Sequence, residues 1–174
     1  MPDLLVNLLS LPPLDPLVLA LEQKRVIIRR AQPFEITPVR AFVRQEFSTA
    51  WADEISVGFA NKPVSVFIAT AAGAVVGFAA YECTRRCFFG PTGVIEQMRG
   101  AGIGKALLLA SLGGLRDLGY VYGIIGRAGP IAFYEKFVGA IVIPGSDPGI
   151  YTDLLRSNSE LESALKQAND TAGT

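Results

Sequence analysis

Hydrophobic residues along this chain follow two spacings, which together predict alternating strands and helices. Runs rich in Val, Ile, Phe and Ala predict strands at residues 26–28, 64–70, 74–83, 87–95, 121–125 and 140–143. Helical spacing and helix-start signals predict helices at residues 17–22, 38–47, 50–59, 100–118 and 130–137. This order predicts a single α/β domain (α+β in some schemes), with helices packed on a mixed sheet.

The two ends of the chain differ in composition from its middle. Residues 1–24 are rich in Leu and Pro, and Pro12-Pro13 and Pro16 interrupt any early helix. We therefore treat residues 1–24 as an N-terminal extension. Residues 157–174 form a polar C-terminal tail, and we expect the whole of 1–174 to be one domain that carries these two segments.

A charge-free stretch runs from Val64 to Tyr81 and is nearly long enough to cross a bilayer as a helix. Ala71-Ala72-Gly73 interrupts it, and Val, Ile, Phe and Thr fill both halves. Two buried strands joined by a tight turn fit this pattern better than a membrane helix. The next strand contains Gly90-Pro91, and because Pro has no N–H to donate, we expect a bulge or a splay there.

Two predicted helices carry boundary signals. Thr37 is placed to be an N-cap, with Pro38 at the first helical position, where its missing N–H is not needed. The longest helix spans residues 100–118 and is apolar on two faces, which predicts that it is well buried. Gly119 follows it as a C-cap.

The composition excludes several classes of protein. Half of the residues are hydrophobic and 18% are charged, which argues against disorder. The 16 basic and 16 acidic residues cancel, so no net charge attracts nucleic acid or an anionic membrane. Met1-Pro2-Asp3 lacks the positive region of a signal peptide. We therefore expect a cytoplasmic protein with no nucleic-acid or membrane partner, whose apolar composition is compatible with a homodimer.

The sequence has no histidine and only two cysteines, Cys83 and Cys87. Without histidine there is no Ser-His or Cys-His nucleophilic pair, and most zinc sites are excluded, so we expect no metal. Two cysteines do not make a disulfide framework, which favours a reducing compartment. Cys83 and Cys87 could face each other across a hairpin, but two buried apolar thiols are preferred.

A glycine cluster, Arg99-Gly100-Ala101-Gly102-Ile103-Gly104, follows an extended segment and opens the longest helix. The first turn of a helix has N–H groups without partners and the positive end of the helix dipole. Glycines let a phosphate approach that backbone closely. Arg99 and Lys105 add positive charge on either side. The cluster therefore predicts a pyrophosphate site, with a ligand-free glycine turn as the alternative.

Two common phosphate motifs do not fit this cluster. The dinucleotide fingerprint G-x-G-x-x-G requires Gly where Lys105 stands. A P-loop requires Gly where Arg99 stands and Ser or Thr where Ala106 stands.

The cluster instead resembles the signature of the GNAT superfamily of acyl-CoA-dependent N-acetyltransferases. That signature is Gln or Arg, two variable residues, Gly, one variable residue, then Gly or Ala, and Arg99 to Gly104 match it. A second family feature, an aromatic pair and an acid before a small-residue turn, resembles Phe133-Tyr134-Glu135 and the residues to Ala140. This version has one extra residue before Gly139 and Ala140 in place of an aromatic.

The resemblance covers roughly residues 26–143 and implies a mixed, mostly antiparallel central sheet flanked by helices, with acetyl-CoA or another acyl-CoA as co-substrate. It implies that the strand before the glycine turn splays from its neighbour and pairs with the pantetheine arm. It also implies that Tyr134 lies near the thioester sulfur. The cofactor-binding residues that it implies are Thr92, Val94, Ile95, Arg99, Gly100, Ala101, Gly102, Ile103, Gly104 and Lys105. The asparagine that many members carry before this tyrosine is missing from Arg127-Ala128-Gly129-Pro130.

The chemistry expected from this resemblance is attack of an amine on the thioester carbonyl, helped by a backbone N–H near Val94 for the oxyanion. Tyr134 is the candidate acid for the leaving thiolate. Glu82, at the end of the apolar hairpin, is the candidate base. Glu46 and Glu54 in the helical region remain alternatives, whereas a dipole or capping role suits Glu96 better.

The acceptor is not named by the sequence. Arg85 and Arg86 could contact an acidic acceptor or a 3′-phosphate, or simply face solvent. Residues 144–149 could contribute Ser146 and Asp147 to an acceptor pocket, or form a plain turn. The leading hypothesis is acetyl transfer to a primary amine of a small molecule or protein. The alternatives are a non-catalytic acyl-CoA sensor and a structural domain without a cofactor.

Overall fold

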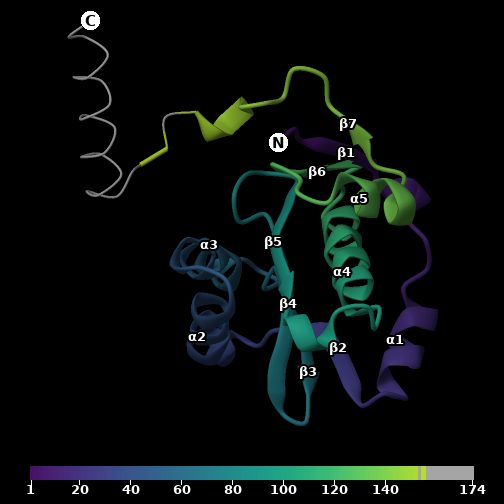
Figure 1. Cartoon of the computed structure of the whole chain (residues 1–174), viewed down its shortest axis with the longest axis vertical. Coiled ribbons are helices and arrows are strands. Elements are labelled where there is room, and N and C mark those ends of the chain that lie inside the picture. Colours follow the sequence, from purple (N-terminus) through teal and green to yellow (C-terminus); the bar gives the residue numbers. More distant parts are fainter. Residues whose placement is uncertain (153, 156–174) are drawn as a thin grey trace, which may run out of the picture.

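The computed structural model describes residues 1–152, 154 and 155, so the tail predicted at residues 157–174 lies outside the described residues. Within the described part, seven strands form one sheet in the order β2-β3-β4-β5-β6-β1-β7 (Figure 1). The strands are β1 Leu4–Asn7, β2 Val26–Arg30, β3 Val66–Ala71, β4 Ala74–Tyr81, β5 Phe88–Val94, β6 Tyr122–Ile125 and β7 Ile141–Val142. Neighbours pair antiparallel except β5 and β6, which are parallel. The predicted mixed, mostly antiparallel sheet is therefore confirmed.

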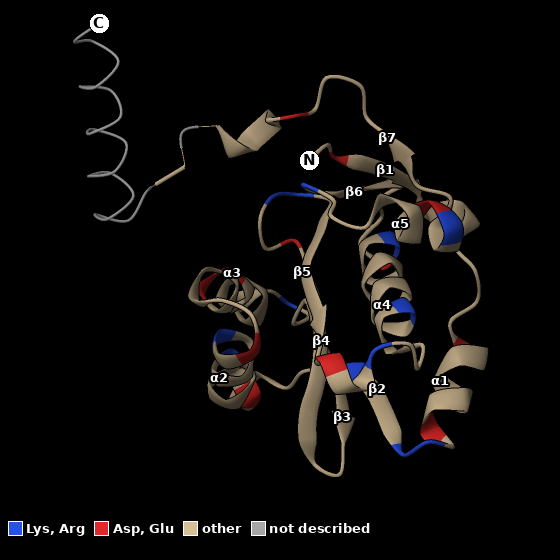
Figure 2. Ribbon diagram, viewed as in Figure 1, with Lys and Arg blue, Asp and Glu red and all other residues tan. Residues whose placement is uncertain are grey.

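Helices cover both faces of this sheet (Figure 1). They are α1 Asp15–Glu22, α2 Ile36–Glu46, α3 Thr49–Ala60, α4 Ile103–Asp117 and α5 Ile131–Val138. One hydrophobic core lies between the sheet and α1, α4 and α5, and a second lies between β3, β4 and the pair α2–α3. Strands β3, β4, β5 and β6 contain no charged residue, and the charges lie mainly on helices and loops (Figure 2). This arrangement explains why the middle of the sequence is so apolar.

The charge-free stretch folds as the predicted hairpin. β3 and β4 pair antiparallel and turn at Ala72-Gly73, where both residues have positive φ. Side chains from Phe78 to Tyr81 are at most 1% exposed, because the strand is covered by helices on both faces. No helix of the described residues is long and apolar enough to cross a bilayer.

The description of residues 1–24 as an extension is corrected by strand β1. β1 pairs with β6 on one side and β7 on the other, so it lies inside the sheet rather than beside it. Leu4, Val6 and Leu8 are fully buried. The strand was not predicted, because its four residues show no distinctive alternation of hydrophobic and polar side chains.

Two predicted helix starts are also corrected. Helix α2 begins at Ile36 instead of after Thr37, because the preceding turn of Pro33–Glu35 is already closed by a reciprocal cap between Gln32 and Glu35. Helix α4 begins at Ile103 instead of Gly100, because Gly100 and Gly102 have φ of 81° and 96°, which helical residues do not adopt. The glycine loop is therefore outside the helix and ahead of its N-terminus.

Candidate active site

Strands β5 and β6 separate along their length and open a cleft. They pair only at Phe88↔Ile124 and Phe89↔Ile125. Beyond Phe89, a register shift between β4 and β5 falls opposite Gly90-Pro91, and β5 continues beside β4 alone. The bulge and splay predicted from Gly90-Pro91 are thus both present.

We name the space between the separated strands the β5–β6 cleft, a cavity of about 450 Å³. Its walls come from β5, the start of α4, the loop after β6, and α5. The residues that line it are Met1, Trp51, Phe89, Gly90, Pro91, Thr92, Gly93, Val94, Arg99, Gly104, Leu108, Ile125, Gly126, Arg127, Ala128, Gly129, Pro130, Phe133 and Tyr134.

The backbone of β5 presents free amides to this cleft. The N–H of Ile95 donates to the carbonyl of Val76 at 3.0 Å, so it belongs to the ladder with β4. Amides alternate sides along an antiparallel pair, so the N–H groups of Val94 and Thr92 point away from β4, toward the cleft. The Val94 carbonyl points the same way and accepts a hydrogen bond from Arg99 Nε at 3.1 Å. An extended ligand lying in the cleft would find donors there.

The glycine loop offers a second group of donors. Among the described residues, none of the backbone N–H groups from Gly100 to Lys105 has a hydrogen-bond partner, and the first helical bond of α4 starts at Ala106. A Cβ on Gly100 or Gly102 would meet no atom within 4 Å, so the space beside both glycines is open. Free amides, an open approach and the helix dipole together make a site suited to a pyrophosphate.

The remaining predicted cofactor residues take different positions. Thr92, Val94, Arg99 and Gly104 line the cleft. Ile95 does not, because its N–H is bound to β4 and its side chain packs on the core.

Ile103 and Lys105 are also not among the residues that line the cleft. Ile103 is 1% exposed in the core and can contribute only its backbone. The Lys105 ammonium lies 4.8 Å from the centre of the Phe137 ring.

Tyr134 is placed at the wall of the cleft by α5. Its ring packs edge-to-face against Phe89 and Phe133, at 6.3 and 5.2 Å between ring centres. Burial raises the pKa of its hydroxyl to about 12, so the hydroxyl stays protonated at neutral pH. Among the described residues this hydroxyl has no hydrogen-bond partner, which leaves it available to a ligand.

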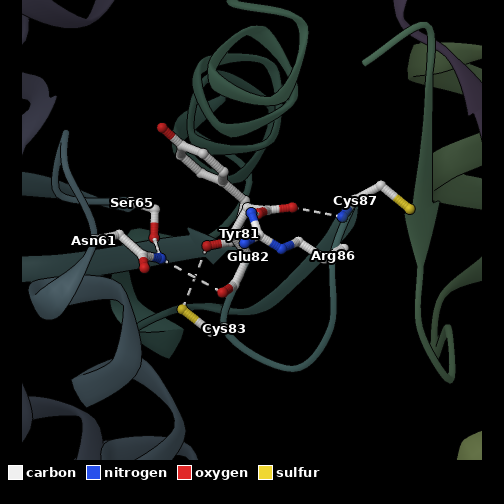
Figure 3. Close-up of polar contacts among 7 residues, drawn as sticks. All are labelled: Asn61, Ser65, Tyr81, Glu82, Cys83, Arg86 and Cys87. Atoms are coloured by element: carbon white, nitrogen blue, oxygen red, sulfur yellow. Dashed lines mark hydrogen bonds and ion pairs between the residues drawn. The ribbon is translucent and has the colours of Figure 1, made fainter. Parts of the chain in front are cut away.

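The choice of Glu82 as the base is corrected by its surroundings (Figure 3). The Glu82 carboxylate accepts the backbone N–H of Cys87 at 2.5 Å and pairs with Arg86 at 3.2 Å, closing the loop between β4 and β5. Glu82 does not line the β5–β6 cleft. Its positive φ of 58° fits a turn residue. Its sequence position at the end of a strand did not reveal that the side chain folds back on its own loop.

Most of the other candidate residues from the sequence either lie outside both cavities or make contacts that stabilise the fold. Glu46 and Glu96 are exposed and line neither the cleft nor the cavity described next. The Ser146 hydroxyl accepts the backbone N–H of Asp3 at 2.9 Å and so holds the start of β1. Cys83 and Cys87 are free thiols that point in different directions (Figure 3).

A second cavity, of about 300 Å³, adjoins the cleft and is here named the side cavity. It shares with the cleft the segments Phe89–Pro91 and Gly126-Arg127, together with Met1 and Trp51. Its own residues are Glu54, Thr84 and Tyr151. Glu54 was one of several candidates from the sequence, whereas Thr84, Arg127 and Tyr151 were not predicted, since they come from separate loops that only the fold brings together.

We compared the sequence and the structure with known proteins. No family model and no protein of curated function matches the sequence. Solved structures do match. A region of a fungal multi-domain GH3 β-N-acetylglucosaminidase, described as a GCN5-related glucosamine N-acetyltransferase, has 17% identity over 82% of this chain and 19% of that chain, with a TM-score of 0.66.

Two further structures agree. A GCN5-related N-acetyltransferase from Sphaerobacter thermophilus has 18% identity over 82% of this chain and 48% of that chain, with a TM-score of 0.62. A GNAT family acetyltransferase from Brucella melitensis, in complex with acetyl-CoA, has 19% identity over 68% of this chain and 86% of that chain, with a TM-score of 0.52. The chain thus spans less than half the length of the first two structures. With its splayed β5 and β6 and the glycine loop before α4, this chain has the GNAT superfamily fold.

Proposed function

We propose that this protein transfers an acetyl group from acetyl-CoA to a primary amine. The observation that carries the proposal is the convergence of three features on the β5–β6 cleft: the free amides of β5, the unpartnered amides of the glycine loop, and the Tyr134 hydroxyl. The pyrophosphate would lie against the loop and the pantetheine arm along Thr92 and Val94. The thioester would then come near Tyr134. The similar structures named above are acetyltransferases, which supports the same assignment.

The reaction needs one new bond and one broken bond. The lone pair of the neutral amine attacks the thioester carbonyl carbon, a C–N bond forms, and the C–S bond breaks. The starting ammonium loses two protons in all; one is balanced by the proton that the departing thiolate gains, and the other is released. Positioning of amine and thioester in one site can lower much of the barrier, since the thioester is already activated. The Val94 N–H is the donor suited to the developing oxyanion.

Tyr134 supplies the proton to the thiolate in this proposal. Its pKa, raised to about 12 by burial, keeps the hydroxyl protonated across the neutral range, which is the form a donor requires. No histidine competes for this role.

Substitution of Tyr134 by Phe tests the assignment. We expect kcat to fall about 100-fold, the scale of a lost general acid, while the Kd for acetyl-CoA stays within a factor of about two. Thiol release with a panel of amines, glucosamine among them, gives kcat, and calorimetry gives Kd. Tyr122→Phe is the matched control, because Tyr122 is 53% exposed on β6 and lies outside both cavities.

The alternative function, a non-catalytic acyl-CoA sensor, predicts a different result. Acetyl-CoA would raise the melting temperature of the protein, but no amine would be acetylated, and Tyr134→Phe would change nothing measurable. If acetyl-CoA fails to raise the melting temperature at all, the donor site itself is wrongly assigned.

A further inference from the structure

The side cavity meets the β5–β6 cleft where the thioester would lie. The two share Phe89, Gly90 and Pro91 on β5, and Gly126 and Arg127 after β6. A molecule in the side cavity can therefore reach the cleft without crossing the core. At about 300 Å³, the side cavity is at the lower end of the ~300–1,000 Å³ range of small-molecule sites.

A carboxylate stands on one wall of the side cavity. Glu54 projects from α3, and one of its oxygens accepts a hydrogen bond from the Thr84 hydroxyl. No other hydrogen bond to Glu54 occurs within residues 1–152, 154 and 155, so its second oxygen has no protein partner there. The hydroxyl of Thr84 holds this half-buried carboxylate in one orientation. A fixed carboxylate with a free oxygen is suited to an ammonium group.

A guanidinium stands on another wall. The backbone N–H of Arg127 donates to Asp3 Oδ1 at 2.7 Å, which fixes the residue in its positive-φ conformation of 46°. Its Cζ lies 5.5 Å from the centre of the Tyr151 ring. Within the described part of the chain, the guanidinium takes part in no ion pair or hydrogen bond. Its donors are therefore available to a carboxylate, which a guanidinium can bind in bidentate fashion.

Tyr151 links the two charges. Burial raises the pKa of its hydroxyl, the carboxylates of Asp3 and Glu54 raise it further, and the cations of Arg127 and Arg85 oppose them. The pKa of Tyr151 is therefore affected by charged groups of both signs around the side cavity. One small cavity thus holds a negative and a positive group that are not paired with each other.

We propose that the side cavity binds the acetyl acceptor and that this acceptor is a small amino carboxylate. Glu54 binds its ammonium group and accepts the proton that must leave before the neutral amine can attack. The second proton, lost from the nitrogen once the C–N bond has formed, balances the proton that the departing thiolate gains. Arg127 binds its carboxylate. This inference rests on the proposed acetyl transfer and adds the chemical class of the acceptor. Amines without an acid, including sugars, polyamines and lysine side chains of proteins, leave the Arg127 guanidinium without a partner.

The test compares matched acceptors with the full chain. Thiol release is measured with acetyl-CoA and α-, β- and γ-amino carboxylates, each beside its own carboxamide, and with glucosamine and a diamine. We expect kcat/KM for at least one amino carboxylate to exceed that of its amide by about 10- to 100-fold, the scale of a hydrogen-bonded charge pair. This comparison uses the wild-type protein, so it does not depend on any variant folding.

Two variants then assign the roles. Arg127→Gln should remove the preference for the carboxylate, so that kcat/KM for the amino carboxylate falls about 10- to 100-fold, toward that of its carboxamide. Glu54→Gln should lower kcat by about 100-fold with both members of a pair, because it acts on the amine that they share. Arg44→Gln and Glu46→Gln are the matched controls, since both residues are exposed on α2 outside the two cavities. Melting temperature should match the wild type in all four variants. Acetyl-CoA affinity should match it in Glu54→Gln and in the two controls, none of which changes a residue that lines the β5–β6 cleft.

The outcomes separate the inference from the function on which it rests. Amides or glucosamine acetylated as well as amino carboxylates, with no effect of Arg127→Gln, would overturn the acceptor class but leave acetyl transfer intact. Acetyl-CoA binding without turnover of any amine would overturn both the acceptor class and the transferase activity, but leave the donor site. Absence of acetyl-CoA binding would overturn the donor site as well.

Discussion

Burial has opposite chemical consequences for two residues, Tyr134 in the wall of the cleft and Cys83 in the second core. It raises the pKa of Tyr134 to about 12, which preserves the proton that a donor must carry. Burial is also the main cause that raises the pKa of the Cys83 thiol to about 12, which removes the thiolate that a nucleophile would need. At the scale of single residues, Cys83 is therefore poorly suited to act as a nucleophile, which agrees with the direct attack by the amine that we propose.

Gly102 provides a residue-scale prediction. Its φ of +96° is unfavourable for any residue with a Cβ, and a Cβ there would project into the open space beside the loop. We expect Gly102→Ala to lower the free energy of unfolding by about 1 kcal/mol and to weaken acetyl-CoA binding at least about tenfold. Urea denaturation and calorimetry measure the two effects.

Gly119→Ala is its control, because Gly119 has a nearly identical φ of +94°, also with open space around it, at the other end of α4. It should show the same loss of stability with unchanged acetyl-CoA affinity. Equal loss of affinity in both variants would mean that the glycine loop makes no special contact with the ligand.

At the scale of elements, helix α4 connects the glycine loop to the core. Its residues Leu107, Leu108, Leu112 and Leu115 are at most 1% exposed, so the helix is held across the sheet by packing on several sides. The loop at its N-terminus therefore has a rigid support, which is what a preformed phosphate site needs. The apolar surface on two faces of this segment had predicted that burial.

Two adjacent glycines in α4 give the element-scale prediction. A Cβ on Gly114 would lie 2.6 Å from the ring of Tyr81, which is 1% exposed and whose hydroxyl accepts from Arg30 at 2.6 Å, so the ring cannot move aside. We expect Gly114→Ala to destabilise the protein by about 1–3 kcal/mol.

A Cβ on Gly113 would meet nothing within 4 Å, so Gly113→Ala should stabilise the helix by about 0.5–1 kcal/mol. Thermal unfolding of the two variants tests the pair. Similar shifts in melting temperature would show that the contact between α4 and Tyr81 is not as close as described.

At the scale of the whole molecule, both cavities lie where distant parts of the chain meet. β1 enters the sheet between β6 and β7, and Asp3 at its start accepts the N–H of Arg127. Tyr151, from the far end of the described chain, lies against Arg127. The side cavity, which is the proposed acceptor site, therefore depends on the start, the middle and the end of the described chain together.

Strand β1 gives a prediction about stability at the scale of the whole molecule. Leu4 is fully buried between the neighbouring strands and the core, so Leu4→Ala should destabilise the protein by about 2–5 kcal/mol. Leu9 is 69% exposed, and Leu9→Ala should change stability by less than about 0.5 kcal/mol. Denaturant unfolding distinguishes them, and a small effect of Leu4→Ala would mean that β1 is an appendage after all.

The sequence by itself determined most of the fold and the location of the proposed donor site. Hydrophobic spacing located β2 to β7 and all of the longer helices, and the glycine cluster with Tyr134 pointed to one cleft, because these signals are local in the chain. β1 and the position of the Glu82 side chain in the loop between β4 and β5 were missed, because a four-residue strand and a side chain that folds back on its loop have no local pattern. Only the tertiary structure brought Glu54, Arg127 and Tyr151 to one cavity, since each comes from a different element and their spacing in sequence carries no signal. The proposed acceptor site therefore depends on the tertiary fold, whereas the glycine loop and Tyr134, on which the proposed donor site rests, are recognisable in the order of the residues.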